Sequence, residues 1–320
     1  MLSLARPFLR LSPAEVTFAK RRFHDPGPEL RLRLEGVGEA FRAGYHAALD
    51  QDEPAPLGRV LDEMPAALRG FAYEGAGMAL ALQDALSFRR RDRVERFLAG
   101  PGEAHTYLVV VGAGWILARL PVRVAPLLAR FDPLVRWLAL DGYGFHEGYF
   151  HWPRAVVGQR RPAKLYGYAR HGFDQGLGRS LWFVCGGEVD RIAETVRRFA
   201  PPRQADLWAG VGLACAYAGG RSAEEMRRLR DQAAEHDLAL AQGAVFAATA
   251  RERAGNPTPH TELACRVLTG VSAAAAAAIT EEARVGLPPD AKEPDGVPAY
   301  EIWRRRICQR LEDMEQKVAS

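Results

Sequence analysis

The sequence predicts an all-α protein built from helical hairpins of about 34 residues, stacked as a solenoid like that of tetratricopeptide repeats. Three observations predict this fold class. A Gly-x-Gly pair followed by small and apolar residues recurs along the chain, strand-like runs are scarce, and helix stop and start signals separate the copies. The first glycines of the copies are Gly36, Gly75, Gly112, Gly142, Gly176, Gly210 and Gly243. The last copy is weaker, because valine replaces its second glycine.

The copies are separated by 39, 37, 30, 34, 34 and 33 residues. The sixth copy shows the expected hairpin best, because its apolar helix stops at Gly219-Gly220 and a second helix starts at Ser222, with Glu225 completing a capping box. We expect each unit to be such a hairpin, with small residues that let neighbouring helices approach closely. The helix-B alanine and closing proline of true tetratricopeptide repeats are not kept, so the likeness is architectural only.

Three segments are expected along the chain. Residues 1–30 form a basic extension, residues 31–285 form the helical-repeat domain, and residues 286–320 form a Pro-rich linker and a charged helix from Tyr300 to Val318. Glu15 is the only acid in the first 23 residues. The extension could touch a membrane or an acidic partner, or it could be a solvated terminal segment.

Composition excludes several classes of protein. Hydrophobic residues make up 48% of the 320 positions and charged residues 26%, which is typical of globular proteins. The net charge of +4 is too small to favour nucleic acid as an obligate partner. The four cysteines have neither disulfide-framework nor metal-ligand spacing, and no apolar run reaches the roughly 20 residues of a membrane helix. We therefore expect a cytoplasmic protein, peripheral at the membrane if the basic extension binds there.

The fourth unit departs from the others. Its residues 137–152 contain two acids, two histidines and six aromatic side chains. Glycines inside this helix cost about 1 kcal/mol each relative to alanine. We expect either close helix packing or room for a ligand to compensate for that cost.

Helical geometry sorts the polar residues of this unit. At about 100° per residue, Glu147 and His151 lie about 40° apart, on the side that carries Gly144 and Gly148. Asp141 lies about 80° from His151 on the opposite flank. These three polar side chains are expected to line one open surface of the helix, at which Gly144 and Gly148 leave space because they have no side chains.

His146 is expected on a separate face of the same helix, together with Tyr149. A carboxylate one turn from an imidazole, as in Glu147 and His151, can form an acid–base pair or provide two ligands of a metal ion. A dinuclear metal site in a helical bundle would need paired Glu-x-x-His units, which the chain lacks, so metal binding is the weaker of these two alternatives. The third alternative is a structural pair whose members satisfy each other.

The repeat register gives an independent argument, because equivalent positions in a solenoid fall along one line. The residues before each Gly-x-Gly are Glu35, Glu74, Val111, Asp141, Gln175, Ala209 and Gln242. Glu74, Asp141 and Gln175, with Asp174 beside it, are expected to point toward a shared groove. Arg179 could reach the same groove as a counter-ion or anion clamp. The alternative is a ladder of hydrogen bonds that only fixes the stacking of the helices.

These arguments select two sets of site residues. The predicted catalytic residues are Glu74, Asp141, His146, Glu147, His151 and Asp174. The predicted substrate-binding residues are Trp115, Tyr143, Tyr149, Gln175 and Arg179. The sequence does not identify a cofactor; iron or another divalent metal held by Glu147 and His151 is the candidate.

Several long motifs resemble one bacterial family. They lie at residues 69–76, 111–120, 138–152, 173–183, 206–220 and 260–265. Together they resemble the UnbL-type enediyne biosynthesis proteins, an uncharacterised family that accompanies enediyne polyketide gene clusters, over roughly residues 30–305. The resemblance implies a role in maturing a polyketide polyene toward an enediyne core, with soluble and membrane-bound partners from the same cluster. It implies no mechanism and no assigned site residues.

Three functions are compatible with these expectations. An enzyme would act on a hydrophobic, polyketide-derived chain in an aromatic-lined groove, by acid–base or metal-assisted chemistry. A helical-repeat scaffold would hold partner enzymes or an acyl carrier. A chaperone would bind an unstable intermediate without converting it. The polar side chains of the fourth unit favour the enzyme, because a pure scaffold gains little from burying them.

Overall fold

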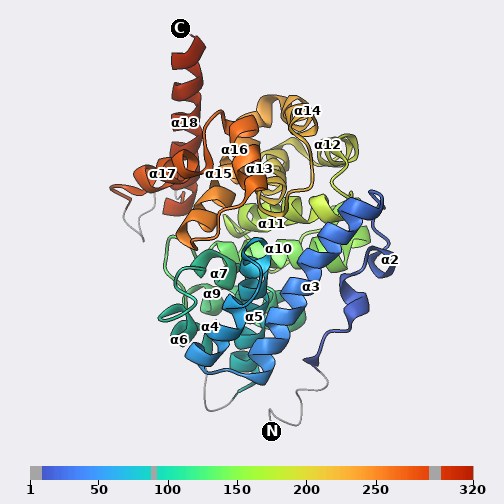
Figure 1. Cartoon of the computed structure of the whole chain (residues 1–320), viewed down its shortest axis with the longest axis vertical. Coiled ribbons are helices and arrows are strands. Elements are labelled where there is room, and N and C mark those ends of the chain that lie inside the picture. Colours follow the sequence, from blue (N-terminus) through green and yellow to red (C-terminus); the bar gives the residue numbers. More distant parts are fainter. Residues whose placement is uncertain (1–8, 88–91, 288–296, 320) are drawn as a thin grey trace.

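The computed structural model describes residues 9–87, 92–287 and 297–319, and the regular elements in these ranges are helices (Figure 1). The all-α prediction is therefore confirmed. The four cysteines are free thiols, as their spacing predicts. Most of the predicted Pro-rich linker, residues 288–296, lies outside the described residues.

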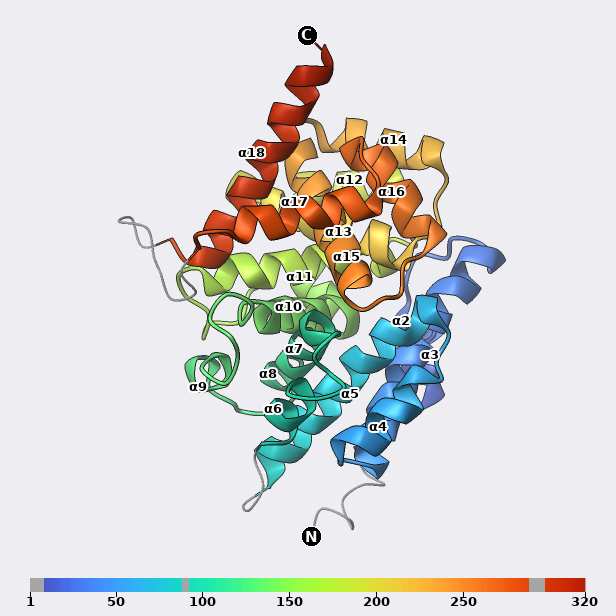
Figure 2. The same cartoon turned by 60° about the vertical axis from the view of Figure 1, so that its left-hand side comes forward.

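The glycine-containing helices pack side by side in chain order, so that each contacts the one before it and the one after it (Figure 2). We call this set the helix stack. It consists of α3 (Pro28–Asp50), α5 (Ala66–Leu86), α7 (Thr106–Gly114), α10 (Leu138–Phe150), α11 (Ala169–Val184), α13 (Pro201–Ala218) and α15 (Asp237–Arg253).

The repeated glycines allow the backbones of the stack to touch. A Cβ atom added to Gly142 would lie 1.8 Å from the carbonyl oxygen of Val111 on the preceding helix. One added to Gly176 would lie 1.7 Å from the carbonyl oxygen of Asp141, and one added to Gly210 would lie 1.9 Å from that of Gln175. No side chain fits at these distances, so the period of the glycines is the period of the helix contacts.

The first helix uses a different register from the one that the sequence predicts. An added Cβ would meet nothing within 4 Å at Gly36, but at Gly44 it would lie 1.9 Å from the carbonyl oxygen of Ala72. Gly75 in turn approaches the carbonyl oxygen of Phe41. Phe41, rather than Glu35, therefore occupies the repeat position of α3. The Glu35 carboxylate instead accepts a hydrogen bond of 2.8 Å from the backbone N–H of Phe18.

Second helices complete the hairpins at the two ends of the stack. They are α4 (Pro54–Asp62), α6 (Arg93–Leu98), α12 (Val189–Arg197), α14 (Ala223–Ala233) and α16 (Pro259–Thr269). The predicted capping box of Ser222 and Glu225 is present at the start of α14.

The expected hairpin is absent after α7 and α10, where short helical pieces and loops follow instead. The pieces are α8 (Ile116–Arg119), α9 (Val124–Leu128) and the π-helical turn η2 (Pro153–Val157). Prolines explain the interruption, because proline removes a backbone donor and clashes with the preceding turn. These segments contain Pro121, Pro126, Pro133, Pro153 and Pro162.

The stack curves until its early and late helices meet. Arg33 of α3 donates a hydrogen bond of 2.8 Å from Nε to the carbonyl oxygen of Ala218, at the end of α13. Arg251 of α15 donates from Nη2 to the carbonyl oxygens of Ala67 and Tyr217, at 2.9 and 2.8 Å. The helices thereby surround an interior, which is where the candidate site lies.

Both ends of the described chain pack onto this body. The N-terminal segment, with η1 (Pro13–Val16) and α2 (Phe18–Arg21), buries Phe18 and Phe23 in the core, so this part of the extension is not a free arm. After α17 (Ala273–Arg284), the predicted terminal helix is present as α18 (Ala299–Ala319) and buries Tyr300 and Trp303.

None of the described helices is by itself long and apolar enough to cross a membrane. Taken together, α16 and α17 pass the same test of length and composition, but they form a bent pair with an angle of 67° between them.

Candidate functional site

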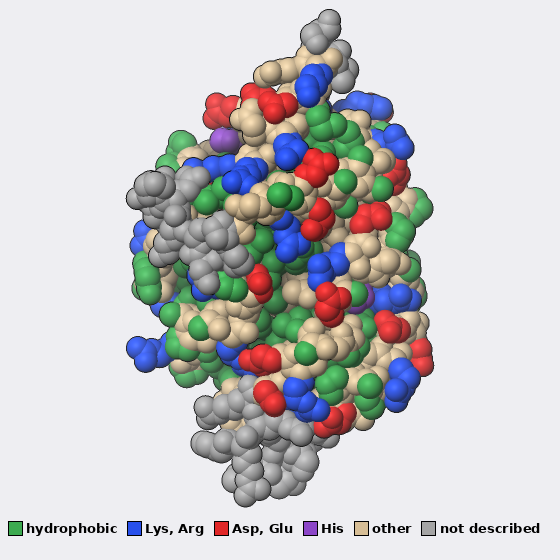
Figure 3. Space-filling model, turned by 90° about the vertical axis from the view of Figure 1, so that its left-hand side faces the viewer, with side chains coloured by type: hydrophobic (Ala, Val, Ile, Leu, Met, Phe, Trp, Pro, Cys, Tyr) green, Lys and Arg blue, Asp and Glu red, His purple; other side chains and the backbone are tan. Residues whose placement is uncertain are grey.

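Two apolar cavities lie inside the curved stack. The larger one has about 670 Å³ of unfilled space and the smaller one about 520 Å³, part of it in each case open to solvent. Phe71, Phe183 and Arg179 line both cavities. Tyr300 and Trp303 of α18 close one side of the larger cavity. One face of the molecule is also hollowed near its middle, with hydrophobic side chains between flanking acidic and basic ones (Figure 3).

A buried ionic group, which we call the inner cluster, lies where the two cavities adjoin. It consists of Glu74 from α5, Asp141 from α10 and Arg179 from α11. The guanidinium of Arg179 pairs closely with Asp141 through Nη1 and lies 3.5 Å from Glu74 Oε2 through Nη2. Glu74 lines the smaller cavity and Asp141 the larger one.

Neutral side chains extend the inner cluster on one side. Gln175 donates from Nε2 to Asp141 Oδ2 at 2.9 Å and to the hydroxyl of Tyr300 at 3.3 Å. The face of Phe145 lies against Arg179, with the guanidinium carbon 4.9 Å from the ring centre. The inner cluster is therefore held by α5, α10, α11 and α18 together.

The charges of the inner cluster do not balance, because one cation faces two acids. Burial raises the pKa of Glu74 to about 7, with Arg179 opposing the rise and Asp141 adding to it. Burial would lower the pKa of Arg179, but the two acids outweigh that effect and raise it. A pKa of about 7 means that Glu74 is present in both its protonated and its ionised form near neutral pH.

Glu74 also has an unused acceptor. Its Oε1 atom has no aligned hydrogen-bond partner among the described residues, although the nearby Trp115 indole helps to lower its pKa. Trp115 stacks on Phe41 with ring centres 4.2 Å apart and lines the smaller cavity. An unpaired carboxyl oxygen beside an apolar cavity is positioned to exchange a proton with a molecule bound there.

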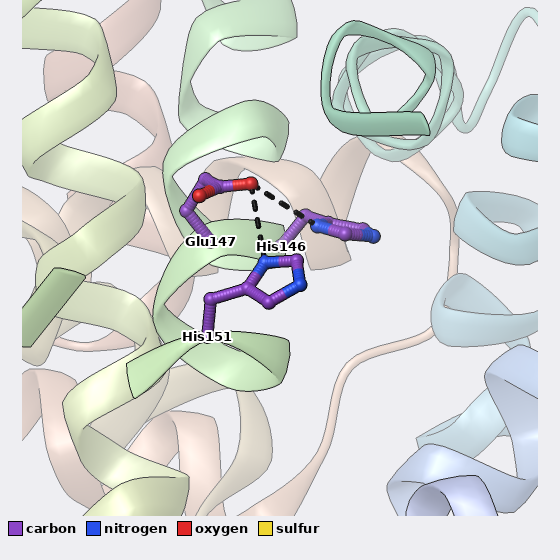
Figure 4. A group of neighbouring side chains, drawn as sticks. All are labelled: His146, Glu147 and His151. Atoms are coloured by element: carbon purple, nitrogen blue, oxygen red, sulfur yellow. Dashed lines mark ion pairs between the residues drawn. The ribbon is translucent and has the colours of Figure 1, made fainter. Parts of the chain in front are cut away.

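A second polar group, which we call the end cluster, lies where α10 ends (Figure 4). Glu147 Oε1 is 3.3 Å from His151 Nδ1 and 3.8 Å from His146 Nδ1. Glu147 Oε2 pairs closely with Arg154. The ligand atoms of His146, Glu147 and His151 all lie within 4.8 Å of one another, so these three residues could hold a metal ion.

Burial and charge set the protonation of the end cluster. Burial would raise the pKa of Glu147, but His146, Arg154 and His151 outweigh it and hold the pKa at about 2. Burial lowers the pKa of His146 to about 4. At neutral pH the cluster thus presents an ionised carboxylate and a neutral imidazole.

Comparison with known proteins identifies a family. The family model described as "Protein of unknown function (DUF1702)" matches residues 1–311. The chain belongs to the DUF1702 family. No curated protein and no solved structure matches it significantly.

In this DUF1702 protein the repeat register correctly brings Glu74, Asp141, Gln175 and Arg179 together. Asp174 does not join them, contrary to the expectation of a shared groove. Its carboxylate instead binds Arg161 and Arg203 on another side of α11, in what we call the outer cluster. Adjacent residues on a helix point about 100° apart, which explains why Asp174 and Gln175 separate.

The prediction of an open surface on α10 beside Gly144 and Gly148 is wrong. Gly144 packs against the backbone of Phe173 and Gly148 against the side chain of Ser180, so α11 covers that side of the helix. Asp141 is consequently separated from Glu147 and His151 and belongs to the inner cluster.

His146 was placed on a separate face but lies within the end cluster, because its neighbour Glu147 turns toward it. Tyr149 lines the smaller cavity, and its hydroxyl donates to the backbone of Val16 at 3.4 Å. Tyr143 packs edge-on against Phe173.

The sequence reasoning missed Tyr300 and Trp303. The sequence predicts a linker and a charged helix for residues 286–320, yet that helix carries an apolar stripe with helical spacing, formed by Tyr300, Trp303, Ile307 and Leu311. That stripe was the available signal for a buried face.

Proposed function

We propose that this protein is an enzyme that binds an elongated hydrophobic molecule, such as a polyene, in its interior and transfers a proton to or from it at the inner cluster. The observation that carries the proposal is the place of Glu74, Asp141 and Arg179: three fully buried ionic side chains where two apolar cavities adjoin. Apolar cavities with a few convergent polar groups are the common form of small-molecule sites.

Energetic reasoning supports a chemical role for the inner cluster. Burying ions costs several kcal/mol each unless every hydrogen-bonding atom is satisfied. The inner cluster leaves Glu74 Oε1 without an aligned partner and has an excess of acid. Perturbed carboxyl groups of this kind are frequent at functional sites.

The roles follow from the chemistry of each side chain. Glu74, with a pKa of about 7, is matched to general acid–base catalysis near neutral pH. Arg179 would bind a carbonyl or carboxylate oxygen at the polar end of the substrate. Asp141 and Gln175 would position Arg179 rather than touch the substrate. Proton removal at one atom and return at another needs no further reactant.

The pathway context is part of the same proposal. We infer from the motif resemblance that the substrate is a polyketide-derived chain of an enediyne-type pathway, handled in the cytoplasm with partner proteins that include a membrane protein. We also infer that the helix stack is related to tetratricopeptide solenoids. The period of 30–37 residues between glycine copies from Gly75 onward supports that relation.

A carrier or chaperone is the alternative function. The two cavities would serve a carrier equally well, because most of their lining is apolar. A carrier has no use for the proton of Glu74, so proton exchange separates the two functions.

Binding is tested with cis-parinaric acid, a polyene carboxylic acid that fluoresces when bound in apolar surroundings. We expect saturable binding near one molecule per chain. Ala214→Phe should weaken it at least tenfold, because Ala214 lines the larger cavity, whereas Ala274→Phe on the exposed face of α17 should not. Native circular dichroism of both variants is the control for folding. Absent binding, or equal binding by both variants, would contradict the proposal.

Catalysis is tested by incubating a polyene acid with the protein in D2O and measuring deuterium incorporation by mass spectrometry. The wild type should incorporate deuterium and Glu74→Gln should lose at least 100-fold in rate, the usual contribution of a general acid–base group. Binding without incorporation by the wild type would establish the carrier instead.

A further inference from the structure

The end cluster has a feature that the proton-transfer proposal does not use. His146 is 1% exposed, and neither of its ring nitrogens has a hydrogen-bond partner among the described residues. Its Nδ1 atom is directed toward Glu147 Oε1 at 3.8 Å, which is too long for a hydrogen bond (Figure 4). Buried imidazoles normally have a partner, so the two ring nitrogens of His146 are available to a ligand.

The local fold brings a third donor to the same point. Helix α10 ends at Phe150, and His151 leaves the helical conformation with φ −128° and ψ 32°. Its backbone N–H still bonds to the carbonyl oxygen of Glu147, which holds the two residues one turn apart. His151 Nδ1 consequently lies 3.3 Å from Glu147 Oε1, on the side where His146 points (Figure 4).

We propose that His146, Glu147 and His151 together bind one first-row divalent transition-metal ion. Two imidazoles and one carboxylate suit ions such as Fe²⁺, Co²⁺ and Zn²⁺ and are poor ligands for Mg²⁺ or Ca²⁺. Metal–ligand bonds of about 2.1 Å require donor atoms roughly 3–3.5 Å apart. The present span of up to 4.8 Å must therefore close by roughly 1.3–1.8 Å on metal binding. The half-exposed His151 side chain can make most of that movement.

One neighbour competes with the metal. Arg154 pairs with Glu147 Oε2 from the solvent side, and its side chain is 59% exposed. Its positive charge opposes a second cation on the same carboxylate, while its exposure lets it move away at little cost. Removing Arg154 should therefore strengthen metal binding, whereas removing a true ligand should weaken it.

The site has a defined relation to the interior. The edge of the Trp115 indole contacts the His146 ring, with ring centres 5.4 Å apart and planes at 86°. Trp115 lines the smaller cavity together with Glu74. Trp115 therefore contacts the proposed metal ligand His146 and also lines the cavity that Glu74 lines.

The test uses the full chain, freed of metal with a chelator and titrated with Co²⁺, whose visible absorption reports its ligands. We expect one Co²⁺ per chain, with absorption typical of nitrogen and oxygen ligands. His151→Asn and Glu147→Gln should each lower the affinity at least tenfold. Arg154→Ala should raise it several-fold. Because His151 lies at the surface end of α10, His151→Asn should keep the native circular dichroism.

His236→Gln is the matched control. His236 Nε2 also lies near a glutamate, 3.6 Å from Glu235 Oε1, but this pair is not part of the three-residue group proposed to bind the metal. His236→Gln should leave the Co²⁺ affinity unchanged. No binding by the wild type, or binding that His151→Asn and Glu147→Gln leave unaltered, would overturn the proposal. Since the readout is the metal, neither result depends on polyene binding or on Glu74.

Discussion

The inner and outer clusters both include a residue of α11, Arg179 and Asp174 respectively, but they satisfy their charges in opposite ways. In the outer cluster Asp174 is fully buried and meets two cations, and each of its oxygens accepts two hydrogen bonds, from Arg161 and from Arg203. In the inner cluster one cation, Arg179, serves two acids and leaves a Glu74 oxygen without an aligned partner. A saturated buried ion pair holds structure together, whereas an unsaturated one beside a cavity is available for chemistry.

The largest expected effect is at the contact between α10 and α11, the two helices that carry Asp141 and Arg179 of the inner cluster. Gly176 of α11 lies against the carbonyl oxygen of Asp141, where an added Cβ would be only 1.7 Å away. Gly176→Ala must push α10 and α11 apart, because the opposing atom is backbone and cannot rotate away. We expect a loss of more than about 5 kcal/mol in the free energy of unfolding, an exceptional value for one substitution.

The measurement for Gly176→Ala is urea unfolding followed by circular dichroism. Gly36→Ala is the control: an added Cβ there has open space within α3, so the protein should gain up to about 1 kcal/mol from better helix propensity. If Gly36→Ala were the more damaging of the two, the repeat register described for α3 would be wrong.

The second expected effect separates the two clusters directly. Asp174→Ala leaves Arg161 and Arg203 facing each other without a counter-ion, and breaking a buried pair in this way costs about 3 kcal/mol or more. Glu74→Gln removes the excess acid and keeps a polar acceptor for Arg179, so the unfolding free energy at pH 7 should not fall by more than about 1 kcal/mol. Both values come from urea titrations under identical conditions.

The reverse order, with Glu74→Gln costing more than Asp174→Ala, would make the inner cluster the structural one. The proposed chemistry would then lose its energetic support. Both acids are buried on helices of the same stack and both pair with arginine. Asp174→Asn, the isosteric counterpart of Glu74→Gln, makes the comparison matched and should also cost more than Glu74→Gln.

The sequence predicts the stack well from the second copy of the motif onward. From Gly75 to Gly243 the spacing of the glycines is the spacing of the backbone contacts, since only glycine permits them. The prediction fails in α3, where the residues at the helix contact are Phe41-Arg42-Ala43-Gly44 and the first glycine of the motif is missing. Gly36 and Gly38 match the Gly-x-Gly pattern, but Gly38 packs against Val16 of the N-terminal segment and not against α5.

The sequence predicts the site less completely, for a reason of geometry. Spacing fixes which residues share a face of one helix, so it correctly joined Glu147 to His151 and Gln175 to Arg179. It does not fix the direction of that face until the neighbouring helices are placed. Asp174 was therefore assigned to the wrong side of α11, and Tyr300 came from a helix more than 100 residues away in sequence.

The smallest expected effect is the pH dependence that Glu74 gives to stability. Its pKa is about 7 in the folded protein, against a reference value of 4.5. The folded state therefore binds this proton more tightly than the unfolded state, and the stabilisation is lost as the pH rises from about 4.5 to about 7. Gln at this position cannot titrate, so Glu74→Gln should gain stability relative to the wild type over this interval, by on the order of 1–3 kcal/mol.

The measurement is the difference in unfolding free energy between Glu74→Gln and the wild type at pH 5 and at pH 8. The sign decides the interpretation. If Glu74→Gln becomes more stable relative to the wild type as the pH rises, the folded protein binds the proton of Glu74 more tightly than the unfolded chain does, as a proton-transfer group requires. If Glu74→Gln instead becomes less stable relative to the wild type as the pH rises, the attraction of Arg179 for ionised Glu74 outweighs the effect of burial. Glu74 is then an ordinary ion-pair partner, and the inner cluster resembles the outer one. Glu63→Gln, an exposed position at the end of α4, controls for the general effect of removing a carboxylate.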